Sequence, residues 1–404
     1  MNTKIFHYRL RRLCSLIIGL VFLVAGIFKL LDPVGAGLVV EEYYHFLHLS
    51  FLLPTAKAVA VTLALIEALL GAALIAGVWR KPVAIASSVL IVLFTILTLI
   101  LAIVNPSMDC GCFGEVIHLS NLQTFIKNLI LLALALIAFA PFRDLGEPRK
   151  RKYVSFAIAA VSIAAFTCYS LSSLPLVDFT PFTPGSELMA SDSDGEDFVS
   201  TFIYEKNGQE GAFTLDKLPD STWTFVRTET MRLNGLKSGQ ETPILSFADS
   251  TGTYKDEMAT SGNVLVMSIH APAKLKGDQW TRVANVLEGA SKAGFTPLLL
   301  VAGTKARMER ISTIVPEVRE TLWPGIYYSD RKTLLAMNRS NGGATWFNDG
   351  QLIMKYHSSR LPSDEDLLRM TGEDPAETML QTSVKGRLRF QGFLLYTIAL
   401  LLLI

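Results

Sequence analysis

The second half of this sequence contains no cysteine. The four cysteines are Cys14, Cys110, Cys112 and Cys168, so no segment after residue 168 can form a disulfide or a reactive thiolate. Charge is also sparse: 18% of the residues are charged, against about 25% in an average soluble domain. The formal net charge is only +1, which gives no reason to expect a nucleic-acid partner.

The sequence lacks a cleavable signal peptide as well. Its basic start, Lys4 with Arg9, Arg11 and Arg12, precedes an apolar run that continues to Leu31. This run is longer than the about 7–15 apolar residues of a signal peptide, and no small-x-small cleavage site follows it directly. We therefore expect the first apolar run to be retained as a membrane helix.

Five apolar runs are long enough to cross a membrane, which takes about 20 residues as a helix. They cover residues 13–31, 59–78, 83–104, 125–142 and 154–174. The first four predict a four-helix membrane domain over residues 1–145, and the fifth predicts another spanning helix within 146–175. An apolar stretch within 388–404 predicts a short C-terminal helix that returns into the membrane.

Basic residues lie on one side of these runs. Eleven lysines and arginines occur at the N-terminus, near residue 80 and after the fourth run: Lys4, Arg9, Arg11, Arg12, Arg80, Lys81, Arg143, Arg149, Lys150, Arg151 and Lys152. The opposite joints, 32–56 and 105–122, contain neither lysine nor arginine. Because short basic loops stay in the cytoplasm, we expect a multi-pass protein of the bacterial inner membrane, surrounded by lipid. Its N-terminus would be cytoplasmic and residues 175–388 extracytoplasmic.

The polar part of the chain has two patterns. Residues 176–242 combine a proline-rich linker with short apolar runs around Asn207-Gly208, which is typical of a two-residue β-hairpin. Over residues 243–375, strand-like apolar runs alternate with helical stretches and end in a hairpin, turned at Asp349-Gly350, and a final helix. This order predicts a mixed α/β domain.

The strongest chemical signal is Asp109-Cys-Gly-Cys-Phe-Gly114 in the second outer joint. Thiols in an oxidising compartment form or exchange disulfides. A Cys-Gly-Cys ring would be very small, and strain makes such a bond easier to reduce. The pair Cys110 and Cys112 therefore predicts redox exchange. The alternatives are a passive clip of the loop and a metal site, but the matching ligands of a zinc site are missing, and we expect no metal.

Glu67 is the second candidate, because it lies in the middle of an apolar run. A carboxylate at membrane depth is expensive and often functional, although polar residues also hold helices together. Lys29 would either pair with Glu67 or extend towards the membrane surface. In the first outer joint, Asp32 and residues 41–44 would form either an interface belt or a pocket wall.

Residues 10–145 resemble the DoxX-like superfamily, and in particular its methylamine utilisation branch, MauE. The resemblance is carried by residues 26–33 (GIFKLLDP), 42–44 (EYY), 67–71 (EALLG) and above all 109–114 (DCGCFG). It implies a four-helix membrane bundle, a redox role for Cys110 and Cys112, and disulfide formation in an exported dehydrogenase. DoxX relatives further imply a quinone as a candidate cofactor.

The order of elements over residues 243–375 is similar to the thioredoxin fold. A thioredoxin has Cys-x-x-Cys after its first central strand, where this chain has His270-Ala-Pro-Ala-Lys. The usual cis-proline loop is replaced by Asn341-Gly-Gly-Ala-Thr345. We therefore expect a thioredoxin-like domain that docks partners and carries no redox chemistry.

Two functions are compatible with these features. In the first, Glu67, Cys110 and Cys112 are the catalytic residues of thiol–disulfide exchange with an exported, periplasmic client protein, and a quinone is the candidate cofactor. In the second, the chain is a non-enzymatic assembly factor whose membrane bundle anchors the docking domain.

Overall fold

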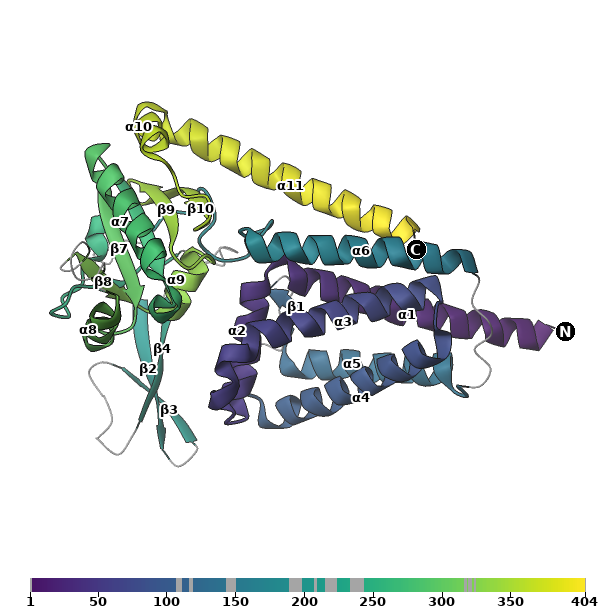
Figure 1. Cartoon of the computed structure of the whole chain (residues 1–404). Coiled ribbons are helices and arrows are strands. Elements are labelled where there is room, and N and C mark those ends of the chain that lie inside the picture. Colours follow the sequence, from purple (N-terminus) through teal and green to yellow (C-terminus); the bar gives the residue numbers. More distant parts are fainter. Residues whose placement is uncertain are drawn as a thin grey trace. The chain divides into compact units, whose positions relative to one another are not determined.

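The computed structural model describes most of the 404 residues. The described ranges are 2–106, 111–115, 119–142, 150–188, 198–206, 209–214, 224–232, 243–315, 318, 322 and 325–403. The chain divides into two compact units (Figure 1). One comprises Met1–Phe179 with Leu380–Ile404, and the other comprises Thr180–Met379.

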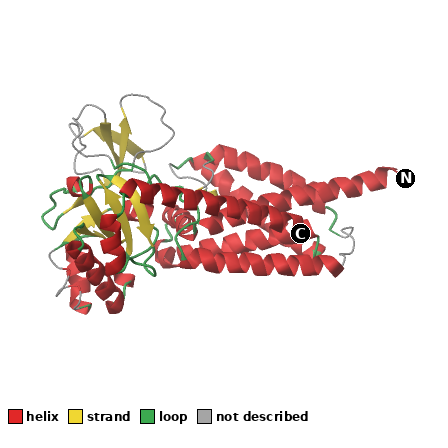
Figure 2. Ribbon diagram, turned by 90° about the horizontal axis from the view of Figure 1, so that it is seen from above, coloured by secondary structure: helices red, strands yellow, loops and turns green. Residues whose placement is uncertain are grey.

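Among the described residues, six helical segments are long and apolar enough to cross a membrane. They are Phe6–Leu31, Ser50–Ala76, Arg80–Val104, Asn121–Phe139, Lys150–Ser172 and Pro375–Leu403. They belong to α1 (Asn2–Leu31), α3 (Ala56–Ala76), α4 (Arg80–Val104), α5 (Asn121–Phe139), α6 (Lys150–Ser172) and α11 (Pro375–Leu403). Figure 1 shows α1, α3, α4 and α5 side by side, and in Figure 2, seen from above, long helices again run alongside one another. The five predicted runs are thus helical, as expected.

Two helices differ from the sequence-based expectation. The joint 32–56 contains a helix, α2 (Pro33–Phe46), and a 3-10 turn, Ser50–Thr55. The short C-terminal helix predicted within 388–404 is in fact 29 residues long and begins at Pro375.

Both unexpected helix starts have one physical cause, an aspartate followed by proline. The Asp32 carboxylate accepts hydrogen bonds from the backbone N–H groups of Val34 and Gly35, at 3.1 and 2.9 Å. The Asp374 carboxylate accepts one from the N–H of Ala376 at 3.0 Å. Aspartate satisfies the first free N–H groups of a helix, and proline needs none at the first position.

Small residues bring α1 and α3 into close contact. Alanines at every fourth position of α3 are buried: Ala56, Ala60, Ala64, Ala68, Ala72 and Ala76. A Cβ atom on Gly71 of α3 would lie only 2.4 Å from the backbone nitrogen of Leu23 in α1. A Cβ on Gly26 of α1 would lie 2.6 Å from the carbonyl oxygen of Ala64. Membrane helices associate largely through such close backbone contacts.

The second unit contains a six-stranded sheet in the order β10-β9-β6-β7-β8-β5. Its strands are β5 (Phe247–Ala248), β6 (Asn263–Ile269), β7 (Thr296–Ala302), β8 (Ile326–Ser329), β9 (Gly343–Asn348) and β10 (Gln351–Tyr356). β6, β7 and β8 are parallel, whereas β9 is antiparallel to both β6 and β10. Between and after the strands lie α7 (Gly277–Lys292), α8 (Lys305–Ile314), α9 (Arg331–Met337) and α10 (Asp364–Gly372). The predicted mixed α/β domain is confirmed.

Both faces of this sheet are buried. In the central strand β6, Leu265, Met267 and Ile269 join one hydrophobic cluster with Trp280 of α7. The alternate residues Val264 and Val266 join a second cluster, with side chains of α9. Successive side chains of a strand point to opposite faces, so an uninterrupted apolar run is typical of a strand covered on both sides.

A separate three-stranded antiparallel sheet has the order β3-β2-β4. Its strands are β2 (Phe198–Lys206), β3 (Gln209–Thr214) and β4 (Thr224–Arg232). Lys206 pairs with Gln209, which confirms the predicted hairpin, although Asn207 and Gly208 themselves lie outside the described residues.

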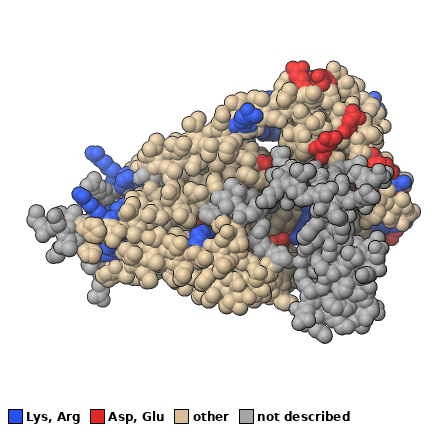
Figure 3. Space-filling model, turned by 180° about the vertical axis from the view of Figure 1, so that it is seen from behind, with Lys and Arg blue, Asp and Glu red and all other residues tan. Residues whose placement is uncertain are grey.

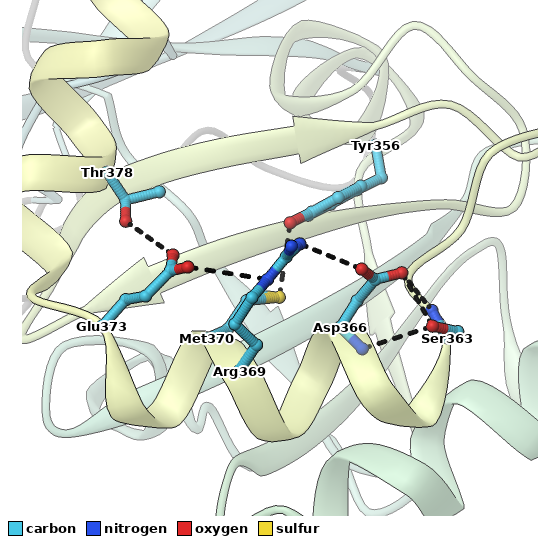
Figure 4. A network of polar contacts seen from close by, with 7 residues as sticks. All are labelled: Tyr356, Ser363, Asp366, Arg369, Met370, Glu373 and Thr378. Carbon is cyan, nitrogen blue, oxygen red and sulfur yellow. Dashed lines mark hydrogen bonds and ion pairs between the residues drawn. The ribbon is translucent and has the colours of Figure 1, made fainter.

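Polar contacts cap the start of α10, and one contact joins this helix to the edge strand β10 (Figure 4). Ser363 and Asp366 form a reciprocal capping box, with the Asp366 N–H 3.2 Å from the Ser363 hydroxyl and the Ser363 N–H 3.0 Å from the Asp366 carboxylate. The hydrogen bonds from Ser363 lower the pKa of Asp366. On β10, the Tyr356 hydroxyl donates to the Met370 sulfur at 3.3 Å, and burial raises the pKa of Tyr356 to about 12. This tyrosine therefore stays neutral at any physiological pH.

The close approach of α1 and α3 predicts the effect of adding one methyl group. Gly71→Ala places its Cβ against the backbone of α1, so the helices must separate, at a cost of roughly 1–3 kcal/mol. We expect a lower thermal unfolding midpoint for the full-length protein in detergent. Gly392→Ala in α11 is the control, because no heavy atom lies within 4 Å of that position. Equal midpoints for Gly71→Ala and wild type would contradict the packing described here.

Candidate functional site

An ion pair lies between the first and third helices of the bundle. The Lys29 ammonium is 2.8 Å from Oε1 and 2.7 Å from Oε2 of Glu67. Lys29 is in the last turn of α1, and its side chain is 11% exposed; Glu67, within α3, is 3% exposed. Of the two alternatives for Lys29, pairing with Glu67 is therefore the one observed.

Each charge stabilises the other in an apolar environment. An isolated charge within a membrane bundle costs several kcal/mol, and a buried pair offsets that cost only when both partners are in contact. The Lys29 nitrogen also lies 5.8 Å from the centre of the Phe94 ring, where the negative face of the ring attracts a cation. The pair therefore fixes the position of two charged groups inside the bundle.

This ion pair lies at the wall of a cavity of about 140 Å³, which we call the thiol cavity. Most of its lining is apolar, and its polar lining residues are Lys29, Tyr43, Glu67, Thr98, Cys112, Lys127 and Asn128. Concave, mainly apolar sites with a few converging polar groups are typical of binding sites for small molecules. The thiol cavity is therefore the candidate functional site.

Two glycines bring Cys112 to this cavity. Gly111 and Gly114 have positive φ angles of 61° and 63°, a conformation that favours glycine. A Cβ atom on Gly111 would lie 2.3 Å from Cγ1 of Val39 in α2. A Cβ on Gly114 would lie 3.5 Å from the carbonyl oxygen of Phe28 in α1. The short segment β1 (Cys112–Glu115) thus packs closely against both helices.

The structure brings together two of the three predicted catalytic residues. Glu67 and Cys112 line the same cavity, although they are 45 positions apart in the sequence. Cys110 lies outside the described residues. Of the first outer joint, Tyr43 lines the cavity, which favours the pocket wall over the interface belt for this residue.

Sequence analysis missed two polar residues of the cavity, Lys127 and Asn128 of α5. The Asn128 side chain donates hydrogen bonds to Oγ1 of Thr98 at 3.1 Å and to the carbonyl oxygen of Phe94 at 3.3 Å, which joins α5 to α4. The signal was available: both residues stand in an apolar run, as Glu67 does. Polar groups at membrane depth are candidates for function wherever they occur.

The other two cysteines lie elsewhere. Cys14 is buried in the hydrophobic core of the bundle, as expected for a structural cysteine. Cys168, on α6, is exposed. Neither lines the thiol cavity.

In the second unit, an asparagine holds the loop that follows the central strand. The Asn341 side chain donates to the carbonyl oxygen of Ala271 at 3.0 Å and accepts from the Ala271 N–H at 2.9 Å. In this chain, the loop that carries Cys-x-x-Cys in a thioredoxin is therefore held by hydrogen bonds to the Asn341 amide.

Comparison with known proteins gives two partial matches. Residues 8–141 match the family described as methylamine utilisation protein MauE, a range that contains every residue lining the thiol cavity. Residues 198–232, the three-stranded sheet, match a domain of unknown function, DUF8463. No curated protein and no solved structure matches the chain. The MauE match and the six candidate spans support a MauE-type, multi-pass membrane protein.

Substitutions at the ion pair test whether its two charges depend on each other. Lys29→Met or Glu67→Leu alone leaves one buried charge without its partner, which costs roughly 3–5 kcal/mol. The double substitution removes both charges and should restore most of the lost stability. The stability of each variant is measured by thermal unfolding of the full-length protein in detergent.

Lys81→Met is the control for loss of a lysine, because Lys81 is exposed and its loss should change stability by less than about 0.5 kcal/mol. Strictly additive effects of the two ion-pair substitutions would show that the charges do not stabilise each other.

Proposed function

We propose that this protein exchanges disulfides with exported client proteins through Cys110 and Cys112. The observation that carries the proposal is the position of Cys112: it lines a cavity inside the bundle together with a buried Lys29–Glu67 ion pair. A disulfide that only braces its loop requires neither a cavity nor charged groups beside the cysteine. A thiol that exchanges disulfides is favoured by both, because nearby positive charge stabilises the thiolate and a cavity can hold a reaction partner.

The proposed exchange transfers one disulfide from the Cys110–Cys112 pair to the client in two steps. A client thiolate attacks one sulfur of the Cys110–Cys112 disulfide and forms a mixed disulfide, with the other sulfur as the leaving thiolate. A second client thiolate then attacks the client sulfur of the mixed disulfide. The client gains one disulfide, the Cys110–Cys112 pair is reduced to two thiols, and the two protons lost by the client thiols end on the sulfurs of Cys110 and Cys112.

The charged groups suit this chemistry. Thiolates, not thiols, are the reactive species, and nearby ammonium groups favour the thiolate form. Two lysines, Lys29 and Lys127, line the cavity with Cys112. Glu67 holds the Lys29 side chain in place through two contacts under 3 Å. We therefore assign Glu67 as a residue that positions Lys29. This differs from the expectation from sequence, in which Glu67 itself takes part in catalysis.

A quinone is the candidate electron acceptor that would restore the disulfide. When bound, such a group supplies a two-electron, two-proton oxidant. The chemistry of the thiol cavity suits such a group: the walls are mostly apolar, and the Lys29 and Lys127 side chains carry N–H donors for carbonyl oxygens. Apolar cavity residues such as Phe22 and Leu97 would hold a flat ring.

The second unit is proposed as a thioredoxin-like docking module. Its core order β10-β9-β6-β7, with β6 and β7 parallel and β9 antiparallel to β6, supports this assignment. Because no cysteine follows Cys168, the module would hold a client while the bundle performs the exchange. The MauE match suggests a client that serves methylamine utilisation, and the DoxX-like resemblance agrees with a redox role.

The proposed topology puts the cysteine loop and residues 175–388 on the extracytoplasmic side of the inner membrane. The asymmetry of the basic residues supports it. Both the loop and the docking module would then face the compartment in which exported proteins acquire disulfides.

The second candidate function is a non-enzymatic scaffold. It is favoured by one observation, the absence of any cysteine from a unit of 200 residues, Thr180–Met379. In this case the cysteine pair would only clip its loop, and its loss would affect stability rather than client oxidation.

Single cysteine substitutions separate the two functions. If the pair exchanges disulfides, Cys110→Ala and Cys112→Ala each abolish client oxidation at unchanged protein level. One of them accumulates a mixed disulfide, because the remaining thiol attacks and nothing resolves the product. Non-reducing electrophoresis of acid-quenched cells detects the complex.

Cys168→Ala is the matched control, because this exposed cysteine lies on α6 and does not line the thiol cavity. It should behave as wild type. Normal client oxidation in the Cys110/Cys112 double variant, with no trapped complex in either single variant, would exclude disulfide exchange and favour the scaffold.

A further inference from the structure

A groove lies along one side of α8 in the second unit, and we call it the α8 groove. Its volume is about 440 Å³, within the range of about 300–1,000 Å³ that is common for ligand sites. Four residues of α8 line it, together with Ala273 in the loop after β6 and the two residues directly before the helix. The whole groove therefore belongs to one compact unit, Thr180–Met379.

The four residues of α8 form one stripe of the helix. They are Arg307, Arg310, Ile311 and Ile314, whose spacing of three or four positions brings them to the same face. Ile311 is buried and joins the hydrophobic core of the unit, so it fixes this part of the helix on the domain. Ile314, the last residue of the helix, is 80% exposed. An apolar side chain is thus open to solvent in the same groove as two guanidinium groups.

The two arginines of the groove form no ion pair within the described part of the chain. The Arg310 side chain donates a hydrogen bond to the carbonyl oxygen of Ala306, at 3.4 Å, within the helix itself. None of the residues that line the groove is acidic. The acidic residue of α8, Glu309, is two positions from Arg307, which is about 200° around the helix axis. The groove itself therefore supplies two positive charges and no carboxylate to offset them.

This positive charge is not a general property of the second unit. Figure 3 shows several acidic side chains exposed on the face of this unit that it displays. Helix α10 has three acidic residues in its first turn, Asp364, Glu365 and Asp366. Because surfaces of opposite charge attract and surfaces of like charge repel, the α8 groove is the part of this unit that suits an acidic partner.

We propose that the α8 groove binds an acidic peptide segment of the client, in which an apolar side chain lies next to the carboxylates. This inference rests on the proposed docking role of the second unit and names the chemistry that the unit recognises.

The residues of the groove suit such a segment. Arginine binds carboxylates through paired, charge-assisted hydrogen bonds. Residues three apart on a helix are neighbours, with about 5–6 Å between their Cβ atoms, so Arg307 and Arg310 can hold two adjacent carboxylates. An apolar side chain of the segment would cover Ile314 and remove its surface from water, which is favourable. A nucleic acid is less suited, because its affinity comes from many phosphate contacts and the groove has two basic side chains.

The test measures peptide binding to the full-length protein in detergent by fluorescence anisotropy. The first labelled peptide contains Leu-Asp-Glu-Leu between Gly-Ser spacers. In the second peptide Asn and Gln replace the two acids, and in the third Ser replaces both leucines. We expect the first peptide to bind and the other two to bind more weakly. No binding of the first peptide, equal binding of all three, or equally strong competition by inorganic phosphate would overturn recognition of an acidic, apolar segment.

Substitutions in α8 locate the binding site. Arg307→Gln and Arg310→Gln should each weaken binding of the first peptide about two- to fivefold, as for loss of one exposed ion pair. Ile314→Ala should weaken it as well. All three side chains are exposed, so the variants should keep the stability of the wild type.

Two matched controls lie outside the groove. Lys305→Gln removes the same charge from an exposed residue of α8 that does not line the groove. Leu368→Ala truncates an exposed apolar side chain of α10. Both should bind the first peptide as the wild type does. Equal weakening by Lys305→Gln and Arg307→Gln would overturn the site in favour of general surface charge.

A measurement in cells separates this inference from the proposed disulfide exchange. The Arg307→Gln, Arg310→Gln double variant should lower client oxidation while the reduction potential of the Cys110–Cys112 pair stays as in the wild type. Normal client oxidation in this variant would overturn the α8 groove as the site that holds the client and would leave disulfide exchange standing. Peptide binding involves no thiol, so failure of the cysteine variants to affect client oxidation would count against the exchange alone.

Discussion

The Lys29–Glu67 ion pair is the interaction on which the bundle and its candidate site depend. Two opposite charges face each other in a region whose other side chains are mostly apolar, at contacts of 2.7 and 2.8 Å. Neither charge could remain there alone, so the packing of α1 on α3 must keep them together. The small residues at that contact, Gly26 and Gly71 above all, allow the two backbones to approach closely enough.

The same packing also shapes the site. The ion pair forms part of the cavity wall, and Gly111, next to Cys112, lets the loop lie against α2 without a clash. The cavity thereby brings together a cysteine, two lysines and apolar side chains, which the proposed disulfide exchange would use. The second unit contributes no thiol, which fits a division of work in which the bundle reacts and the α/β unit binds.

Much of the fold was predictable from sequence, because membrane spans and strands buried on both faces leave long apolar runs. Helices cover the five predicted apolar runs, and the strand–helix alternation after residue 243 is present. The starts of α2 and α11 are marked by Asp-Pro pairs at residues 32 and 374. Hydropathy, from which the other helices were predicted, does not register this capping signal. In the site, Glu67 was predicted because it is a charged residue within an apolar run, and Cys112 because it belongs to the Cys-Gly-Cys motif. That Glu67, Cys112 and Lys127 line one cavity could not be predicted, because it depends on how the helices pack and not on any local sequence pattern. Cys110 lies outside the described residues.

The reduction potential of the Cys110–Cys112 pair tests the central claim most directly. The full-length protein is equilibrated in glutathione buffers of defined potential, quenched with an alkylating agent, and the reduced fraction is measured by mass spectrometry. An exchanging pair should have a potential above about −300 mV, as labile and catalytic disulfides do. A potential below that value, where structural disulfides lie, or the absence of a Cys110–Cys112 disulfide under oxidising conditions, would contradict disulfide exchange as the function of this protein.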